Sequence, residues 1–320
     1  MIEKRWAKEE ELGEILEFID YVFSKAHRPH DFVSLLPKLY GEHGDSAAHH
    51  FILREEGKLA AVVLCYPIML HMEGETLKAL GVGSVSTHPA MRGRGYMKLL
   101  MDAVDERAKE TGTDFAVLSG LRQRYEHYGY VYGGYQMNAK LTAHNVQHAL
   151  QKMESGEWSV IPMGKEHVKC AMALHQKQRC FCDRREETWL DILRSWNNEP
   201  FVLMKSGKAM GFGTLRRNAD STHVAELLLE REEDFPAAMK VLSAEHGALT
   251  ICAAPWETER AAWLTKVCQD FSIAKNHAYK IYHPERIRTA CAAMGFHQSG
   301  FEFGGFSLPM PLYIGPPDCV

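Results

Sequence analysis

The residues best suited to chemistry in this chain form a short loop, Arg92-Gly93-Arg94-Gly95. An apolar run at residues 77–85 precedes the loop, and apolar residues recur at helical spacing after it, which predicts a strand, a loop and a helix. The first N–H groups of such a helix lack partners within it, and the positive end of the helix dipole lies there too. Glycine allows close backbone approach, and arginine adds positive charge. The loop therefore predicts a phosphate or pyrophosphate site.

Two common phosphate-binding loops do not fit this stretch. A Walker loop needs Gly-Lys-Ser/Thr, and a dinucleotide fingerprint needs Gly-x-Gly-x-x-Gly directly after its strand. Residues 92–97 instead resemble the Arg/Gln-x-x-Gly-x-Gly/Ala signature of the GNAT superfamily of acyl-CoA-dependent N-acyltransferases. Met97 departs from that signature, because Gly or Ala is usual at its position. The preceding residues, 85–89, are similar to the fourth strand of that superfamily.

The resemblance implies that the loop binds acetyl-CoA as a co-substrate. Backbone N–H groups of the loop would hold the pyrophosphate, and the exposed edge of the preceding strand would pair with the pantetheine amides. The thioester would lie between that strand and the one that ends at Leu118. The expected cofactor-binding residues are Val85, Ser86, Thr87, Arg92, Gly93, Arg94, Gly95, Tyr96 and Met97.

A second motif follows the strand expected at residues 114–118. The sequence Tyr125-Glu126-His127-Tyr128-Gly129-Tyr130 is similar to the Tyr-x-x-x-Gly-Phe/Tyr helix of the same superfamily. By that resemblance Tyr125 is the acid that protonates the departing thiolate, a role that suits a phenol because it is neutral at pH 7. Packing beneath the sheet is the alternative role of Tyr125.

The elements around these motifs follow one pattern in both halves of the chain. Alternating and apolar runs at residues 51–69 and 77–85 predict antiparallel strands, and residues 9–23 carry a helical apolar stripe. Residues 201–215 and 224–229 repeat the strand order in the second half. We therefore predict an α+β protein with two tandem GNAT-like domains, each a mixed, mostly antiparallel twisted sheet with helices on both faces.

The predicted domains differ at the turn that follows the fourth strand. Residues 1–145 form the expected catalytic domain, 146–156 a connector, and 157–320 a degenerate GNAT-like domain with a short C-terminal extension. In the second domain Glu230-Arg231-Glu232-Glu233-Asp234 replaces the Arg-Gly loop. Its four carboxylates would repel a pyrophosphate.

One active and one degenerate domain are together similar to the enhanced intracellular survival group of acetyltransferases. Members of that group usually carry a further sterol-carrier-like domain, for which the residues after Pro284 are too few. In that group a terminal carboxylate reaches the active site, so the resemblance implies Val320 as a catalytic residue. The acceptor contacts would come from residues 23–40.

Composition excludes several classes of partner. The chain has 37 Lys and Arg against 41 Asp and Glu, a net charge of −4, which offers no general attraction for nucleic acid or an anionic membrane. We expect a cytoplasmic protein, because charged sequence follows Met1 directly and no spanning apolar segment is evident. Assembly into a homo-oligomer is left open.

Histidine and cysteine positions give no metal signature. Cys180-Phe181-Cys182 lacks the spacing of a zinc site and a second ligand pair, although His175 is near in sequence. His43, His49 and His50 flank a loop and are expected at the surface. We predict no metal site.

The sequence therefore predicts an N-acetyltransferase that moves an acetyl group from acetyl-CoA to a primary amine of a small molecule or peptide by direct attack. A non-catalytic acyl-CoA-binding sensor or scaffold is the alternative. The general base and the identity of the acceptor are not determined by the sequence.

Overall fold

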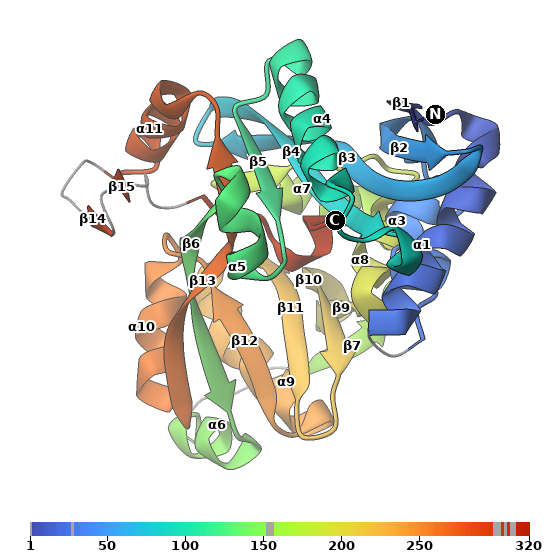
Figure 1. Cartoon of the computed structure of the whole chain (residues 1–320). Helices are drawn as coiled ribbons and strands as arrows, with labels where there is room; N and C mark the ends of the chain where they lie inside the picture. The colour runs from blue at the N-terminus through green and yellow to red at the C-terminus, as the bar shows by residue number, and fades with distance from the viewer. Residues whose placement is uncertain (1, 27–28, 152–156, 297–301, 304–305, 308–311) are drawn as a thin grey trace. The chain divides into compact units, whose positions relative to one another are not determined.

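The computed structural model describes residues 2–26, 29–151, 157–296, 302–303, 306–307 and 312–320 (Figure 1). These residues fall into two compact units. Unit 1 comprises residues 1–133, 277–309 and 319–320, and unit 2 comprises residues 134–276 and 310–318. The units depart from the ranges expected from the sequence, because residues 134–145 group with unit 2 and residues 277–309 group with unit 1. The expected connector overlaps the end of α6 (Ala143–Ala149), and residues 152–156 lie outside the described residues.

The sheet of unit 1 is mixed and mostly antiparallel. Its order is β1-β2-β3-β4-β5-β13, with β4 and β5 parallel. The strands are β1 (Ile2–Trp6), β2 (His50–Glu55), β3 (Lys58–Met72), β4 (Glu75–Thr87), β5 (Phe115–Leu118) and the last residues of β13 (Asp270–Ile281). Tight turns at Gly57 and Gly74, both with positive φ, join β2 to β3 and β3 to β4.

Helices cover both faces of this sheet. Val63 and Cys65 of β3 pack in one cluster with Leu100 and Val104 of α4 (Tyr96–Thr111). Val62 and Leu64 alternate with them, are fully buried, and face the side where α1 (Leu12–Ala26) contacts β3 and β4. The smaller helices of unit 1 are α2 (Phe32–Leu35), α3 (Pro37–Tyr40), α5 (Arg122–Tyr125) and α11 (Pro284–Ala293).

Unit 2 repeats this plan. Its sheet has the order β6-β12-β11-β10-β9-β7. The strands are β6 (Val131–Leu141), β7 (Trp158–Pro162), β9 (Glu199–Lys205), β10 (Lys208–Arg217), β11 (Thr222–Leu229) and β12 (Leu249–Ala253). The longer helices are α7 (Val168–His175), α9 (Phe235–His246) and α10 (Thr258–Val267), with the shorter α8 (Trp189–Arg194). The mixed, mostly antiparallel fold class is confirmed.

Each sheet takes one strand from the other half of the sequence. In unit 2, β6 runs antiparallel to β12, with Met137 opposite Ala253. In unit 1, the end of β13 runs antiparallel to β5, with Ala278 opposite Leu118. This pairing explains why a single cut in the sequence cannot separate the two units.

Candidate functional site

Strands β4 and β5 part at the place where the sequence predicts the acyl site. Their parallel ladder has three pairs, the last joining Gly81 to Val117. Beyond it, the register between β3 and β4 shifts, so that Leu64 faces Gly83 and Val62 faces Ser86. This shift is a β-bulge around Ser84, whose φ is +51°. Beyond the last pair with β5, β4 continues for six residues to Thr87, so this segment is available to pair with a ligand.

A buried hydrogen-bond chain supports the bulge. The Tyr40 hydroxyl lies 2.9 Å from Oγ of Ser84 and 3.2 Å from Nε2 of His50. Nδ1 of His50 lies 2.8 Å from the carbonyl oxygen of Ser46. Burial lowers the pKa of His50 to about 4 and raises that of Tyr40, so both side chains are neutral near pH 7. The expectation that His50 lies at the surface is wrong, because β2 begins at this residue and turns its imidazole inward.

The predicted phosphate loop has the geometry of an anion cradle. Gly95 is the N-cap of α4 with φ +79°, and Gly93 has φ +81°. A Cβ on either glycine would meet no atom within 4 Å, so the space beside the loop is open. The N–H groups of Tyr96 and Met97, the first two residues of the helix, have no acceptor within it. Two backbone donors and the positive end of the helix dipole therefore lie next to the open space at Gly93 and Gly95.

The two arginines of this loop differ in their surroundings. Nη1 of Arg94 lies 2.5 Å from Oε2 of Glu55, so its charge is already compensated in part. Arg92 is exposed and has extended backbone. Tyr96 is buried against the α4 face of the sheet. The structure therefore leaves Arg92 as the more available of the two positive charges.

The predicted pantetheine-binding residues lie on the far part of β4. Ser86 is buried, and its hydroxyl donates to the carbonyl oxygen of Ser84 at 3.0 Å. Val85 packs against the α4 cluster, and Thr87 is paired with Ala61 of β3. All three follow the last pair with β5 and so belong to the parted segment.

Tyr125 lies at the end of α5 and is 5% exposed. Its ring packs against Gly120, where a Cβ would lie 2.5 Å from Cε2, and contacts Tyr130 edge-on with ring centres 6.1 Å apart. Burial raises the pKa of Tyr125. The phenol therefore keeps its proton at neutral pH and can donate it.

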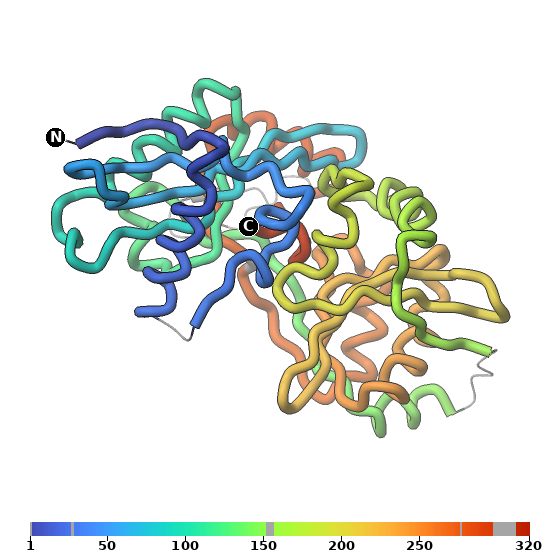
Figure 2. Tube along the Cα trace, turned by 90° about the vertical axis from the view of Figure 1, so that its right-hand side faces the viewer, coloured from blue at the N-terminus to red at the C-terminus, as the bar shows by residue number. Residues whose placement is uncertain are grey.

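The C-terminal residues of the sequence lie on β4 within unit 1. A Cβ placed on Gly81 would overlap the Val320 side chain, and one placed on Gly83 would lie 3.4 Å from the backbone carbonyl carbon of Val320. The ammonium of Lys38 in α3 donates to the carbonyl oxygen of Cys319. Figure 2 shows this red end of the trace beside the blue segment that carries α3. Val320 thus lies where β4 and β5 part, next to the predicted thioester position.

Sequence reasoning missed a second group in unit 1, formed by Ser119, His277 and Cys319. Nδ1 of His277 lies 2.8 Å from Oγ of Ser119, and its Nε2 lies 3.0 Å from Sγ of Cys319. These residues come from three distant segments, so no spacing in the sequence joins them.

The corresponding turn of unit 2 is closed by ion pairs. Glu232 precedes α9, and both of its carboxylate oxygens lie 2.7 Å from nitrogens of Arg260. Asp234 is buried, with Nζ of Lys205 at 3.3 Å. The prediction that this turn does not bind phosphate depends on its acidic residues, and these residues pair with Arg260 and Lys205 of the same unit.

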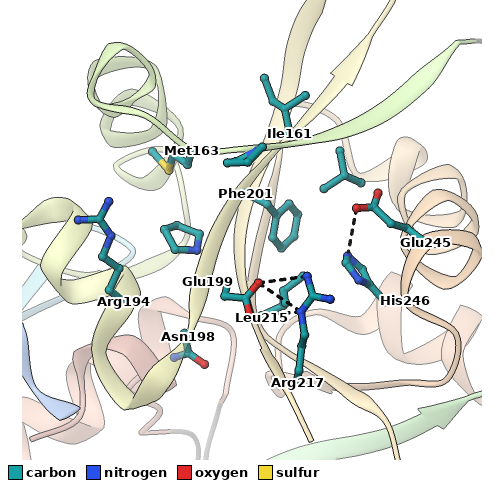
Figure 3. Close-up of a pocket in the computed structure, with 13 residues that line it drawn as sticks. Ile161, Met163, Arg194, Asn198, Glu199, Phe201, Leu215, Arg217, Glu245 and His246 are labelled. Carbon is teal, nitrogen blue, oxygen red and sulfur yellow. Dashed lines mark hydrogen bonds and ion pairs between the residues drawn. The ribbon is translucent and has the colours of Figure 1, made fainter. Parts of the chain in front are cut away.

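Unit 2 also contains a pocket of about 380 Å³ at the ends of β7, β9 and β10 (Figure 3). Buried Phe201 and Leu215 line it, together with an ion pair of Arg217 and Glu199 at 3.2 Å. None of the residues predicted to bind a cofactor lines this pocket.

Residues 3–133 match the family profile described as acetyltransferase (GNAT) domain. No curated protein sequence matches the chain. A probable N-acyltransferase from Enterococcus faecalis V583 is similar in structure, with a TM-score of 0.71, 14% identity, and coverage of 90% of this chain and 74% of that one. Eis1 from Mycobacterium abscessus has a TM-score of 0.63 and 13% identity, with coverage of 92% and 76%.

A more distant likeness is N-myristoyltransferase from Saccharomyces cerevisiae with bound myristoyl-CoA. Its TM-score is 0.52 at 11% identity, and the match covers 88% of this chain and 83% of that one. At such low identities these structures confirm the fold. In the part of the chain that the structure describes, no helix has the length and apolar character to cross a membrane, and no group of three or more His, Cys, Asp or Glu could hold a metal ion.

Proposed function

We propose that unit 1, whose residues 3–133 match the acetyltransferase (GNAT) domain profile, transfers an acetyl group from acetyl-CoA to a primary amine of a small molecule or peptide. The observation that carries this proposal is the parting of β4 from β5 after Gly81, directly before the glycine cradle of the α4 turn. The free edge of β4 offers backbone hydrogen-bond groups, and the glycine cradle follows it along the chain. This order suits a ligand with a diphosphate at one end and amides along its arm.

The residues present fit acyl-CoA at the level of chemistry. The N–H groups at the start of α4 would hold the diphosphate, and exposed Arg92 would add charge. The open edge of β4 at Val85 and Thr87 would hold the pantetheine amides. The acyl thioester supplies the electrophilic carbonyl when it is bound, and its carbonyl would lie beside Val320 and the end of β5.

Two groups of unit 1 are suited to the proton transfers. Tyr125 would donate a proton to the departing thiolate, because burial keeps its phenol neutral. The carboxylate of Val320 would take a proton from the attacking amine, because its carbon lies over Gly83 on the parted strand. Lys38, which holds the adjacent Cys319 carbonyl, would fix this end of the chain in place.

The experiment that tests the proposal is calorimetric titration of acetyl-CoA into the wild type and Gly95→Glu. Gly95 has φ +79° and borders the open cradle, so a glutamate there adds strain and a negative charge beside the diphosphate. We expect binding to weaken by about 100-fold or more, equivalent to about 2.7 kcal/mol.

Gly207→Glu is the matched control, since Gly207 has φ +78° and equally open space, and lies in a hairpin of unit 2. It should cost similar stability and leave the binding heat intact. Equal binding by Gly95→Glu and wild type would contradict the proposal.

A further inference from the structure

We propose that Cys319 is a nucleophile that accepts the acyl group from acyl-CoA, with His277 as its base, so that an acyl-cysteine precedes acylation of the amine. The inference deepens the proposed function and rests on it for the source of the acyl group. It assigns the reaction a covalent step that the direct-attack route lacks.

The geometry is that of an activated thiol. Sγ of Cys319 lies 3.0 Å from Nε2 of His277, within hydrogen-bond reach for sulfur. On the other side of the ring, Nδ1 lies 2.8 Å from Oγ of Ser119. When Nδ1 carries the proton and donates to Ser119, the Nε2 lone pair accepts the thiol proton. A nucleophile, a base and a third group that orients the base recur in cysteine-dependent acyl transfer.

The fold brings this group to the end of the parted strands. Ser119 directly follows β5, and His277 directly precedes the pair between Ala278 and Leu118. Val320, the neighbour of Cys319, lies on Gly81 and Gly83 of β4. The thiol is therefore held beside the gap between β4 and β5, where the proposed function places the thioester.

Partial exposure and a contact with an imidazole occur together at Cys319. Cys65 and Cys291 are buried, and burial raises the pKa of each to about 12. Burial also raises the pKa of Cys252 to about 11. Cys319 is half-buried and touches an imidazole.

The step balances without any further reactant. The Cys319 thiol gives its proton to Nε2 of His277, and Sγ forms a bond to the acyl carbon as the bond from that carbon to the sulfur of coenzyme A breaks. Tyr125 donates a proton to the departing sulfur, as in the proposed function, and coenzyme A leaves as a free thiol. An amine then attacks the acyl-cysteine, forms the amide and releases the Cys319 sulfur, which regains its proton from His277. The amine gives one proton to the Val320 carboxylate, and this proton restores the Tyr125 phenol through solvent. One thioester is exchanged for another, so no oxidant or reductant is needed.

The test is to incubate the full chain with acetyl-CoA and no amine, then measure the intact mass and the modified peptide. We expect one acetyl group on Cys319, removable by neutral hydroxylamine, and one equivalent of released coenzyme A. Cys319→Ser should abolish the adduct. His277→Asn should slow its formation by about 100-fold, because the base is lost. Cys268→Ser, at another half-buried cysteine, should form the adduct as the wild type does.

A second donor separates this inference from the proposed function. The acetyl thioester of N-acetylcysteamine lacks the diphosphate, so it can reach the thiol without the α4 cradle. If this donor acetylates Cys319 but the protein does not bind acetyl-CoA, the proposed function is contradicted and the role of Cys319 as a nucleophile is supported. Intact acetyl-CoA binding with no adduct on Cys319 from either donor would overturn the inference, as would an adduct that forms equally fast in His277→Asn.

Discussion

The turn from β4 to α4 in unit 1 and the turn from β11 to α9 in unit 2 share one backbone plan and have opposite chemistry. In both units the parallel ladder stops early, at Gly81 with Val117 and at Val224 with Ile251. In both, the neighbouring antiparallel ladder has a bulge near that point. The strand geometry that we propose for acyl-CoA binding is therefore present twice, and the side chains beside it differ between the two copies.

In unit 2 a buried ion cluster lies at the strand directly after its bulge. Glu226 follows the bulge and binds Arg184 through two contacts of 3.0 and 2.7 Å. Arg184, with a side chain that is 0% exposed, also binds Asp318 at 2.8 and 2.7 Å. Unit 1 has Ser86 after its bulge, and its hydroxyl is bonded to the strand itself. The two units therefore differ in what supports the strand after the bulge, an ion cluster in unit 2 and a local hydroxyl bond in unit 1.

Removal of the arginine at the centre of this cluster should give the largest effect. Arg184→Met leaves Glu226 and Asp318 close together without a cation, which should cost about 3–5 kcal/mol in the free energy of unfolding. Urea unfolding measures this cost. Arg217→Met is the control, because its pair with Glu199 is exposed on both sides and should contribute at most about 1 kcal/mol. Equal losses in the two variants would contradict the role of the buried cluster.

Acid should lower the stability of unit 1 by protonating His50, which belongs to the buried hydrogen-bond chain beside the β4 bulge. The pKa of His50 is about 4 in the folded chain and 6.5 as the ordinary value, so the unfolded chain binds more protons between these limits. Stability is therefore full above pH 6.5 and falls toward pH 4, with a loss of about 3 kcal/mol from this group. His50→Gln should flatten the dependence of unfolding free energy on pH by that amount. His148→Gln, at an exposed histidine, controls for the loss of an imidazole. If the unfolding free energy of wild type and His50→Gln changes equally with pH, the prediction is wrong.

The helices that follow β5 and β12 occupy equivalent places in the two units, and they differ in the residue that could transfer a proton. In α5 the buried residue is Tyr125, whereas α10 carries Arg260, which is bonded to Glu232 and Glu257. Tyr125→Phe should lower the maximal rate of acetyl transfer by about 100-fold, because the general acid is lost. Calorimetry should show unchanged acetyl-CoA binding. Tyr128→Phe, on the same segment, should keep the rate, and an unaltered rate in Tyr125→Phe would assign Tyr125 to packing.

The local parts of this arrangement could be predicted from the sequence. Glycines in the α4 turn, the tight turns at Gly57 and Gly74, and the acidic turn before α9 are all encoded by neighbouring residues. Such signals depend on backbone conformation and short-range charge, so they can be read in one window of sequence.

Long-range pairing could not be predicted in the same way. Strand β6 pairs in the sheet of unit 2, and the end of β13 pairs in the sheet of unit 1. Hydrophobic periodicity predicts that each segment forms a strand, but it does not predict which strand lies next to it. For the same reason Ser119 and His277, 158 residues apart, could not be joined in advance. The sequence predicts a surface position for His50, because a histidine beside a loop shows no signal of its buried bonds to Tyr40 and Ser46.

The smallest expected effect concerns the two arginines beside the open turn. Arg92→Gln removes an exposed charge near the proposed diphosphate and should weaken acetyl-CoA binding by about 0.5–1 kcal/mol. Arg94→Gln should weaken it less, because Glu55 already compensates Arg94 at 2.5 Å. Titrations at low and high salt measure both changes, and the difference between the variants should shrink as salt screens the charges. A larger loss in Arg94→Gln would mean that its guanidinium leaves Glu55 for the ligand, and that the ion pair is a resting position of the open site.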